Sequence, residues 1–211
     1  MPAYFSIEFQ YNKQDLKETT VSDFVTGLLK YGLSFKSGFL DSENDTLENI
    51  LSWNQNKLGH NFKLCHEEIY TNDYKQCLFD FYDFSEVRLY ILNHIDSDVF
   101  SFCLIIPEND FIEYREYDGK SQIYERDDRM SIIENLAIYM WENSYMCCIQ
   151  TGSECSECPV EIKEIDKGKE PLIEPFAIVP EKYYKENWDC NFEKVKREGY
   201  ILRNVDNWLY I

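Results

Sequence analysis

The chain has 211 residues, 44% of them hydrophobic and 16% aromatic, which is enough to bury a core without a metal or disulfide and excludes a disordered chain. Its 39 acidic and 21 basic residues give a net charge of -18, which disfavours binding to nucleic acid or to an anionic membrane and favours a basic protein partner. Because no basic leader and no apolar run of about 18 residues is present, we expect a cytoplasmic protein whose eight cysteines are reduced thiols.

The N-terminal part of the chain predicts two strand–helix pairs. Aromatic and aliphatic residues alternate with polar ones over the first segment, as in a half-buried strand. Apolar residues then recur at helical spacing in two segments that each begin at a threonine and end at a glycine. The expected elements are a strand at 3–11, a helix from Thr20 to Gly32, a strand at 33–40 and a helix from Thr46 to Gly59.

The middle of the chain predicts an antiparallel meander followed by a polar segment. Three apolar, β-branched stretches of strand length, at 77–82, 86–94 and 99–106, are separated by short polar turns. The segment 108–128 comes next and holds eight acidic and three basic residues. We name it the acidic belt, and parts of it are compatible with a hairpin.

The C-terminal third predicts a helix, several strands and a long loop. Ser131 and Glu134 have the spacing of a capping box at the start of an amphipathic helix. The elements expected after this helix are a strand at 145–150, a long polar loop at 151–174, a strand at 175–179, a short helix from Asn191 to Gly199 and a strand at 207–211.

This order of elements indicates an α+β fold with a mainly antiparallel sheet and helices packed on one face. We expect residues 1–211 to form a single domain. The only good linker, the loop at 151–174, would leave a C-terminal piece of fewer than about 40 residues, which rarely folds alone.

The best local motif is a CxxC pair, Cys155 and Cys158. Two thiolates at this spacing can bind one zinc ion, with Cys148 as a further ligand, but no second CxxC is present to complete the site. The acidic surroundings argue against a redox motif, since they raise thiol pKa values. We therefore interpret Cys155 and Cys158 as ordinary loop cysteines. The alternative is a zinc site, and zinc is then the cofactor that we expect.

The sequence contains no motif that identifies a reaction. It has no glycine-rich nucleotide loop, no GxSxG elbow and only three histidines. Carboxylates are numerous enough that a pair such as Asp80 and Asp83 can be chosen for acid–base chemistry, but this abundance favours a solvated acidic face.

Aromatic residues lie among the carboxylates of the acidic belt. Rings surrounded by negative charge suit an interface with a basic protein, in which the rings anchor and the charges steer. The alternative is a hairpin whose aromatic residues pack inward. The candidate partner-binding residues are Asp110, Phe111, Glu113, Tyr114, Glu116 and Tyr117.

We therefore expect a non-enzymatic acidic protein that neutralises a basic protein partner. In size, acidity and lack of catalytic signatures it resembles bacterial toxin-immunity proteins. The resemblance is one of general class, and it assigns no binding role to any particular residue. The alternatives are a small zinc-bearing domain and an enzyme that uses carboxylates. The sequence indicates neither the identity of the partner nor the oligomeric state.

Overall fold

The computed structural model describes residues 3–62, 73–93, 97–117, 120–154 and 156–205, and for residues 114–117, 120–125 and 127 it describes the backbone alone. The described strands are β1 (Tyr4–Asn12), β2 (Ser34–Gly38), β3 (Cys77–Asp80), β4 (Val87–Leu92), β5 (Val99–Pro107), β6 (Ile112–Tyr117), β7 (Lys120–Glu125), β8 (Cys148–Ser153), β9 (Phe176–Pro180), β10 (Cys190–Val195) and β11 (Gly199–Asn204). The described α-helices are α1 (Thr20–Tyr31), α2 (Leu47–Gly59), α3 (Asp127–Asn143) and α4 (Ile162–Asp166).

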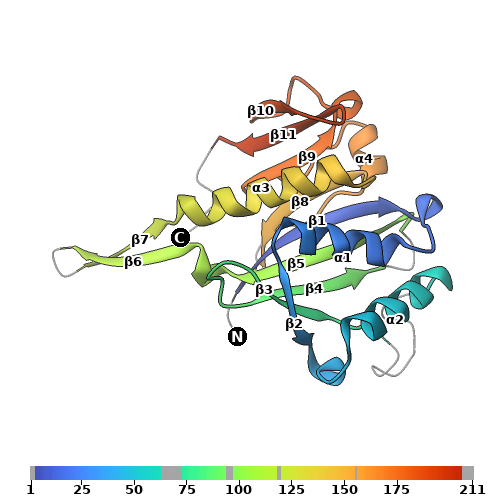
Figure 1. Cartoon of the computed structure of the whole chain (residues 1–211). Helices are drawn as coiled ribbons and strands as arrows, with labels where there is room; N and C mark the ends of the chain where they lie inside the picture. The colour runs from blue at the N-terminus through green and yellow to red at the C-terminus, as the bar shows by residue number, and fades with distance from the viewer. Residues whose placement is uncertain (1–2, 63–72, 94–96, 118–119, 155, 206–211) are drawn as a thin grey trace.

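One antiparallel sheet dominates the described part of the chain (Figure 1). Its nine strands pair in the order β10-β11-β9-β8-β1-β5-β4-β3-β2, so strands from both ends of the chain enter the same sheet. The mainly antiparallel sheet expected from the sequence is therefore present, together with four described α-helices. The expected meander is also present, because β3, β4 and β5 are antiparallel neighbours.

Strand β1 shows why this sheet forms. Its alternating side chains place Phe5, Ile7 and Phe9 on one face, where each is fully buried. The strand pairs with β5 along its whole length and with β8 on the other side, as in the partners Phe9↔Phe102 and Phe9↔Ile149. It is therefore a central strand of the sheet.

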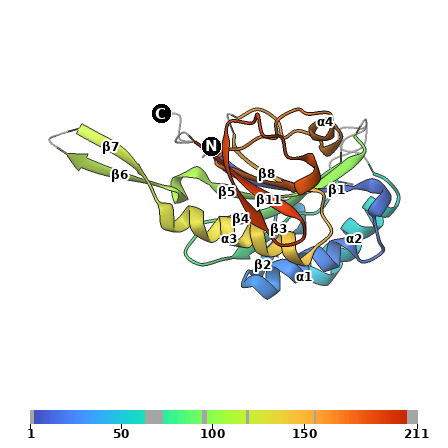
Figure 2. The ribbon, with the colours of Figure 1, turned by 90° about the horizontal axis from the view of Figure 1, so that it is seen from above.

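Helices α1, α2 and α3 pack on the face that carries these aromatic residues (Figure 2). Their apolar stripes join one core cluster with the inward residues of the strands. The ring of Phe24 in α1 stacks on Phe102 in β5 with a centroid distance of 4.1 Å. At the start of α2, Thr46 is the N-cap, and its hydroxyl oxygen accepts a hydrogen bond from the Asn49 backbone N–H at 3.3 Å.

The opposite face of β8, β9 and β11 has a second core. Alternate residues of these strands, such as Cys148, Ala177 and Leu202, join a separate cluster with Ile162 and Ile165 of α4. Figure 2 shows α4 on the other side of the sheet from α1, α2 and α3. The expectation of helices on one face thus describes α1, α2 and α3 but not α4.

Three expected elements differ from the structure. Residues 191–199, expected as a short helix, contribute to β10 and its turn, because pairing with β11 overrides the helix-forming residues Glu193, Lys194 and Arg197. The segment 151–174 begins inside β8 and contains α4, so it is not simply a polar loop. Helix α3 begins at Asp127, before the expected capping box at Ser131. The expected strand at 207–211 lies outside the described residues.

Candidate functional site

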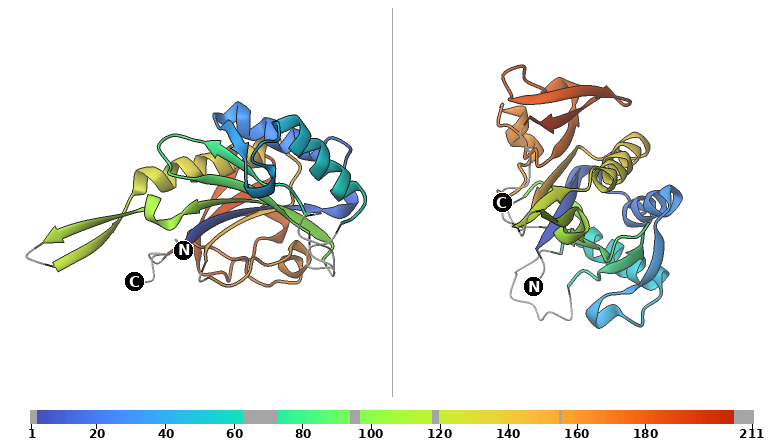
Figure 3. Two further views of the ribbon diagram at one scale, coloured as in Figure 1. Left: turned by 90° about the horizontal axis from the view of Figure 1, so that it is seen from below. Right: turned by 90° about the vertical axis from the view of Figure 1, so that its left-hand side faces the viewer.

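Strands β6 and β7 form a hairpin that projects from the body of the molecule; we call residues 112–125 the arm (Figures 1 and 3). Its register runs from Ile112↔Glu125 to Tyr117↔Lys120. Within the described residues these two strands pair only with each other. Most of the acidic belt therefore lies on an element that stands apart from the main sheet.

The base of the arm is anchored in the core by Phe111. This side chain is fully buried, and its ring lies 4.9 Å from Phe5 and 5.6 Å from Phe84 between centroids. The Arg126 backbone N–H donates to the Phe111 carbonyl at 2.8 Å and closes the base of the hairpin. Phe111 is therefore a core residue, and the expectation that it is an exposed partner-binding anchor is wrong.

Asp110 ties the base of the arm to the β3–β4 loop, residues 81–86. One carboxylate oxygen of Asp110 accepts hydrogen bonds from the Ser85 backbone N–H and hydroxyl, both at 2.8 Å. In the same loop, Asp83 forms an ion pair with Arg129 of α3, whose side chain is almost entirely buried. The loop, the start of α3 and the base of the arm thus form one connected unit.

The remaining expected partner-binding residues lie on the arm at known register positions. Glu113 is exposed. In the register of the hairpin, Glu113 lies opposite Tyr124, Tyr114 opposite Ile123, Glu116 opposite Ser121 and Tyr117 opposite Lys120. The structure thus places these four positions on one hairpin, whereas Asp110 and Phe111 lie at its base.

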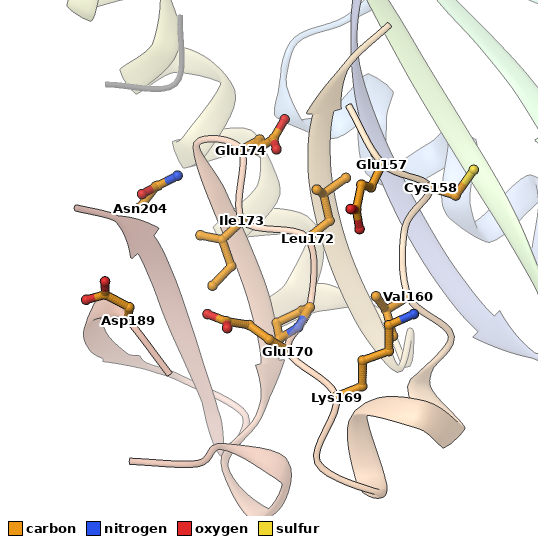
Figure 4. A pocket seen from close by; sticks show the side chains of 11 residues that line it. Glu157, Cys158, Val160, Lys169, Glu170, Leu172, Ile173, Glu174, Asp189 and Asn204 are labelled. Atoms are coloured by element: carbon orange, nitrogen blue, oxygen red, sulfur yellow. The ribbon is translucent and has the colours of Figure 1, made fainter. Parts of the chain in front are cut away.

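A second feature is a cavity of about 330 Å³ on the face of the sheet that α4 covers (Figure 4). Its walls come from the segments at 157–160 and 169–174 together with Asp189 and Asn204. Four carboxylates line it: Glu157, Glu170, Glu174 and Asp189. The cavity thus gathers acidic side chains from three separate segments in the C-terminal third of the chain.

A buried glutamine holds the walls of this cavity in place. The Gln150 side-chain oxygen accepts from the backbone N–H of Val160 at 3.0 Å and of Leu172 at 2.8 Å. Its amide nitrogen donates to the Val160 carbonyl at 2.7 Å, as does that of Gln10 at 3.1 Å. The sequence analysis did not predict this role. The signal available in the sequence was a glutamine in each of two largely apolar strands, Gln10 in β1 and Gln150 in β8.

Within the cavity, the pKa of Glu170 is raised. The first cause is partial removal of its carboxyl group from water, and the second is the negative charge of Asp189. A hydrogen bond from the Asp189 backbone opposes the shift. The Glu170 residue as a whole remains exposed, so this carboxyl group is both accessible and easier to protonate than an isolated glutamate.

The three candidate zinc ligands are not assembled into a described site. Cys148 is fully buried, and its burial raises the pKa of the thiol and favours the protonated form over the thiolate that binds zinc. Cys158 is exposed and lines the cavity, and Cys155 lies outside the described residues. Among the residues that the structure describes, no three His, Cys, Asp or Glu side chains are placed to hold a metal ion.

Comparisons of the chain with protein-family models, with curated proteins and with solved structures found no match. In the part of the chain that the structure covers, none of the helices combines the length and the apolar character needed to cross a membrane.

Proposed function

We propose that the chain is a non-enzymatic binding protein that neutralises a basic protein partner, as toxin-immunity proteins do. The observation that supports this best is the arm, which projects from the body and holds much of the acidic belt. An extended element of this kind reaches into a partner's surface without disturbing the core from which it arises. The buried Phe111 and the Asp110–Ser85 hydrogen bonds give it a fixed base.

Electrostatics supports the same proposal. A net charge of -18 repels nucleic acid and attracts a basic protein over distances comparable with the Debye length, about 8–10 Å in physiological salt. Charges placed at the rim of an interface mainly raise the association rate. We therefore expect binding to be fast and sensitive to salt, and we expect the partner to meet the chain in the cytoplasm.

Charge reversal on the arm tests this function. We expect the triple variant Glu113→Lys, Glu116→Lys, Glu125→Lys to bind the basic partner at least about tenfold more weakly, mainly through slower association. Asp110 is left intact because it positions the β3–β4 loop. Surface plasmon resonance at two salt concentrations measures the association and dissociation rates.

The matched control reverses three exposed carboxylates away from the arm, Asp41→Lys, Glu43→Lys and Glu186→Lys. Both variants have the same net charge, so they differ only in where the change lies. We expect the control to retain affinity within about threefold. Equal losses in the two variants would show that net charge acts alone and that the arm has no special role.

The four-carboxylate cavity favours a second candidate function, an enzyme that uses a carboxyl pair for acid–base chemistry. Glu170, whose carboxyl pKa is raised, and the neighbouring Asp189 would supply the acid and the base. We expect such an enzyme to hydrolyse some member of a panel of chromogenic esters, phosphates and glycosides. The double variant Glu170→Gln, Asp189→Asn should then be inactive. Turnover that is undetectable, or unchanged in the variant, would contradict this candidate.

A further inference from the structure

The β3–β4 loop presents one aromatic side chain to solvent between two buried ones. Phe81 and Phe84 are inside the core, and the Phe84 backbone N–H donates to the Phe81 carbonyl at 3.2 Å to form a tight turn. Tyr82, between them, is 71% exposed. The Tyr82 ring therefore lies largely in solvent while its buried neighbours fix the backbone.

The backbone of Tyr82 is in the left-handed region, with φ of 47°. Glycine and asparagine adopt this conformation readily, whereas a bulky aromatic residue does so at a cost in energy. A ring that is 71% exposed gains little burial to offset this cost. A residue of this type at such a position suggests that its side chain has a role outside the fold.

A chain of ring contacts connects Tyr82 to helices α1 and α3. The Phe81 ring contacts both Tyr82, at 4.9 Å, and Tyr31 of α1, at 6.0 Å, and Tyr31 lies 5.1 Å from Tyr139 of α3. Along the chain, Tyr82 is flanked by the side chains of Asp80 and Asp83, which are 66% and 72% exposed. Each carboxylate also has a basic neighbour: Lys36 lies 3.4 Å from Asp80, and Arg129 pairs with Asp83. The rim of this aromatic surface thus holds two exposed carboxylates, each of them in an ion pair within the chain.

This surface adjoins the arm. The end of β3, the start of β4 and the end of β5 lie at the same end of the antiparallel sheet, and the arm follows β5 there (Figure 1). The Ser85–Asp110 hydrogen bonds and the Asp83–Arg129 ion pair connect the loop directly to the arm's base.

We propose that Tyr82 is the aromatic anchor of the surface that binds the basic partner, with Asp80 and Asp83 as its charged rim and the arm as a second contact. A lysine or arginine of the partner is attracted to the ring face and to the adjacent carboxylates together. Tyrosine is also among the residues that dominate binding energy at protein interfaces. This inference rests on the proposed function, and it assigns to Tyr82 the anchoring role that Phe111 does not have.

Photo-crosslinking from single positions tests the proposal on the full-length chain. The photoreactive residue p-benzoylphenylalanine replaces Tyr82, Tyr117 at the tip of the arm, or Leu40, one at a time. Leu40 is a close match for Tyr82, because it is also 71% exposed and has a positive φ of 51°, but it follows β2 at the opposite end of β3. Each purified chain is irradiated in lysate of the cells that encode it, and adducts are identified by mass spectrometry.

The outcomes separate the two claims. We expect positions 82 and 117 to crosslink the same basic protein, and position 40 to give no such adduct. Crosslinking from position 117 alone would overturn the anchoring role of Tyr82 while leaving the proposed function in place. An acidic adduct, a second copy of the chain, or no adduct at either position would overturn both.

A binding measurement with the crosslinked protein then tests the anchor quantitatively. Tyr82→Asn removes the ring but keeps a residue that tolerates the left-handed backbone, and Leu40→Asn is the matched control. We expect Tyr82→Asn to weaken binding about tenfold or more with unchanged thermal stability, and Leu40→Asn to change binding less than about twofold. Equal affinities of the two variants would contradict the proposal.

Discussion

A turn between β10 and β11 shows how single residues fix the position of α3. Arg197 and Glu198 both have positive φ, 60° and 51°, although neither is glycine. The Arg197 guanidinium lies 4.0 Å from the Trp141 ring centroid and donates to the Trp141 carbonyl at 2.9 Å, near the C-terminal end of the helix. A cation at this end also interacts favourably with the helix dipole, so the turn acts as a clamp.

Gly199 is the residue of this clamp that tolerates no side chain. A Cβ atom there would lie 2.7 Å from the Trp141 ring nitrogen, which itself donates to the Lys196 carbonyl at 3.0 Å. We expect Gly199→Ala to lower the free energy of unfolding by about 1–3 kcal/mol, because the buried ring must move. Urea denaturation followed by tryptophan fluorescence measures the change.

Gly59 provides the control for that prediction. It ends α2, and nothing lies within 4 Å of a Cβ added there. Gly59→Ala should be neutral or should stabilise the protein by up to about 1 kcal/mol, since alanine favours helix. If both variants have the same stability, Trp141 does not pack on Gly199 as described.

At the same scale, sequence patterns predicted the direction of side chains in regular strands but not at irregular positions. The alternation in residues 3–11 correctly predicted β1, because a period of two is enforced by the pleat. Phe111 precedes the arm in a short turn where no period applies, so nothing local distinguished a buried ring from an exposed one. Tyr82 was missed because its exposure depends on the turn between two buried phenylalanines.

At the scale of elements, long periodic segments were predicted and short charged ones were not. Helices α1 and α2 follow from their apolar stripes and terminal residues. Strand β10 was taken for a helix because most of its residues are exposed at the edge of the sheet and lack apolar alternation. The acidic belt was recognised as a candidate hairpin, but its projection from the body depends on how β5 and α3 are packed.

The arm can be tested as an element by shortening it. Replacing residues 113–124 by an Asn-Gly turn keeps Phe111, Ile112 and Glu125 and removes the projecting part. An isolated two-stranded hairpin is only marginally stable, so we expect the free energy of unfolding to change by no more than about 1 kcal/mol. A loss above about 3 kcal/mol in the same denaturation assay would show that the arm supports the fold.

At the scale of the whole molecule, composition predicts a basic protein partner but does not indicate which surface would bind it. The net charge of -18 is spread over the chain, and the structure adds two places where negative charge gathers with other features. One is the arm with the neighbouring Tyr82, and the other is the four-carboxylate cavity. The first suits association with a basic protein, and the second suits acid–base chemistry.

The most direct test of the binding function is affinity capture from lysate of the cells that encode the chain. Tagged intact and arm-shortened chains are compared, each washed at low and at high salt. We predict that the intact chain retains one stoichiometric basic protein at low salt, that high salt releases it, and that the shortened chain does not retain it. An empty capture at both salt concentrations, or equal recovery by the shortened chain, would contradict the proposed role of the arm.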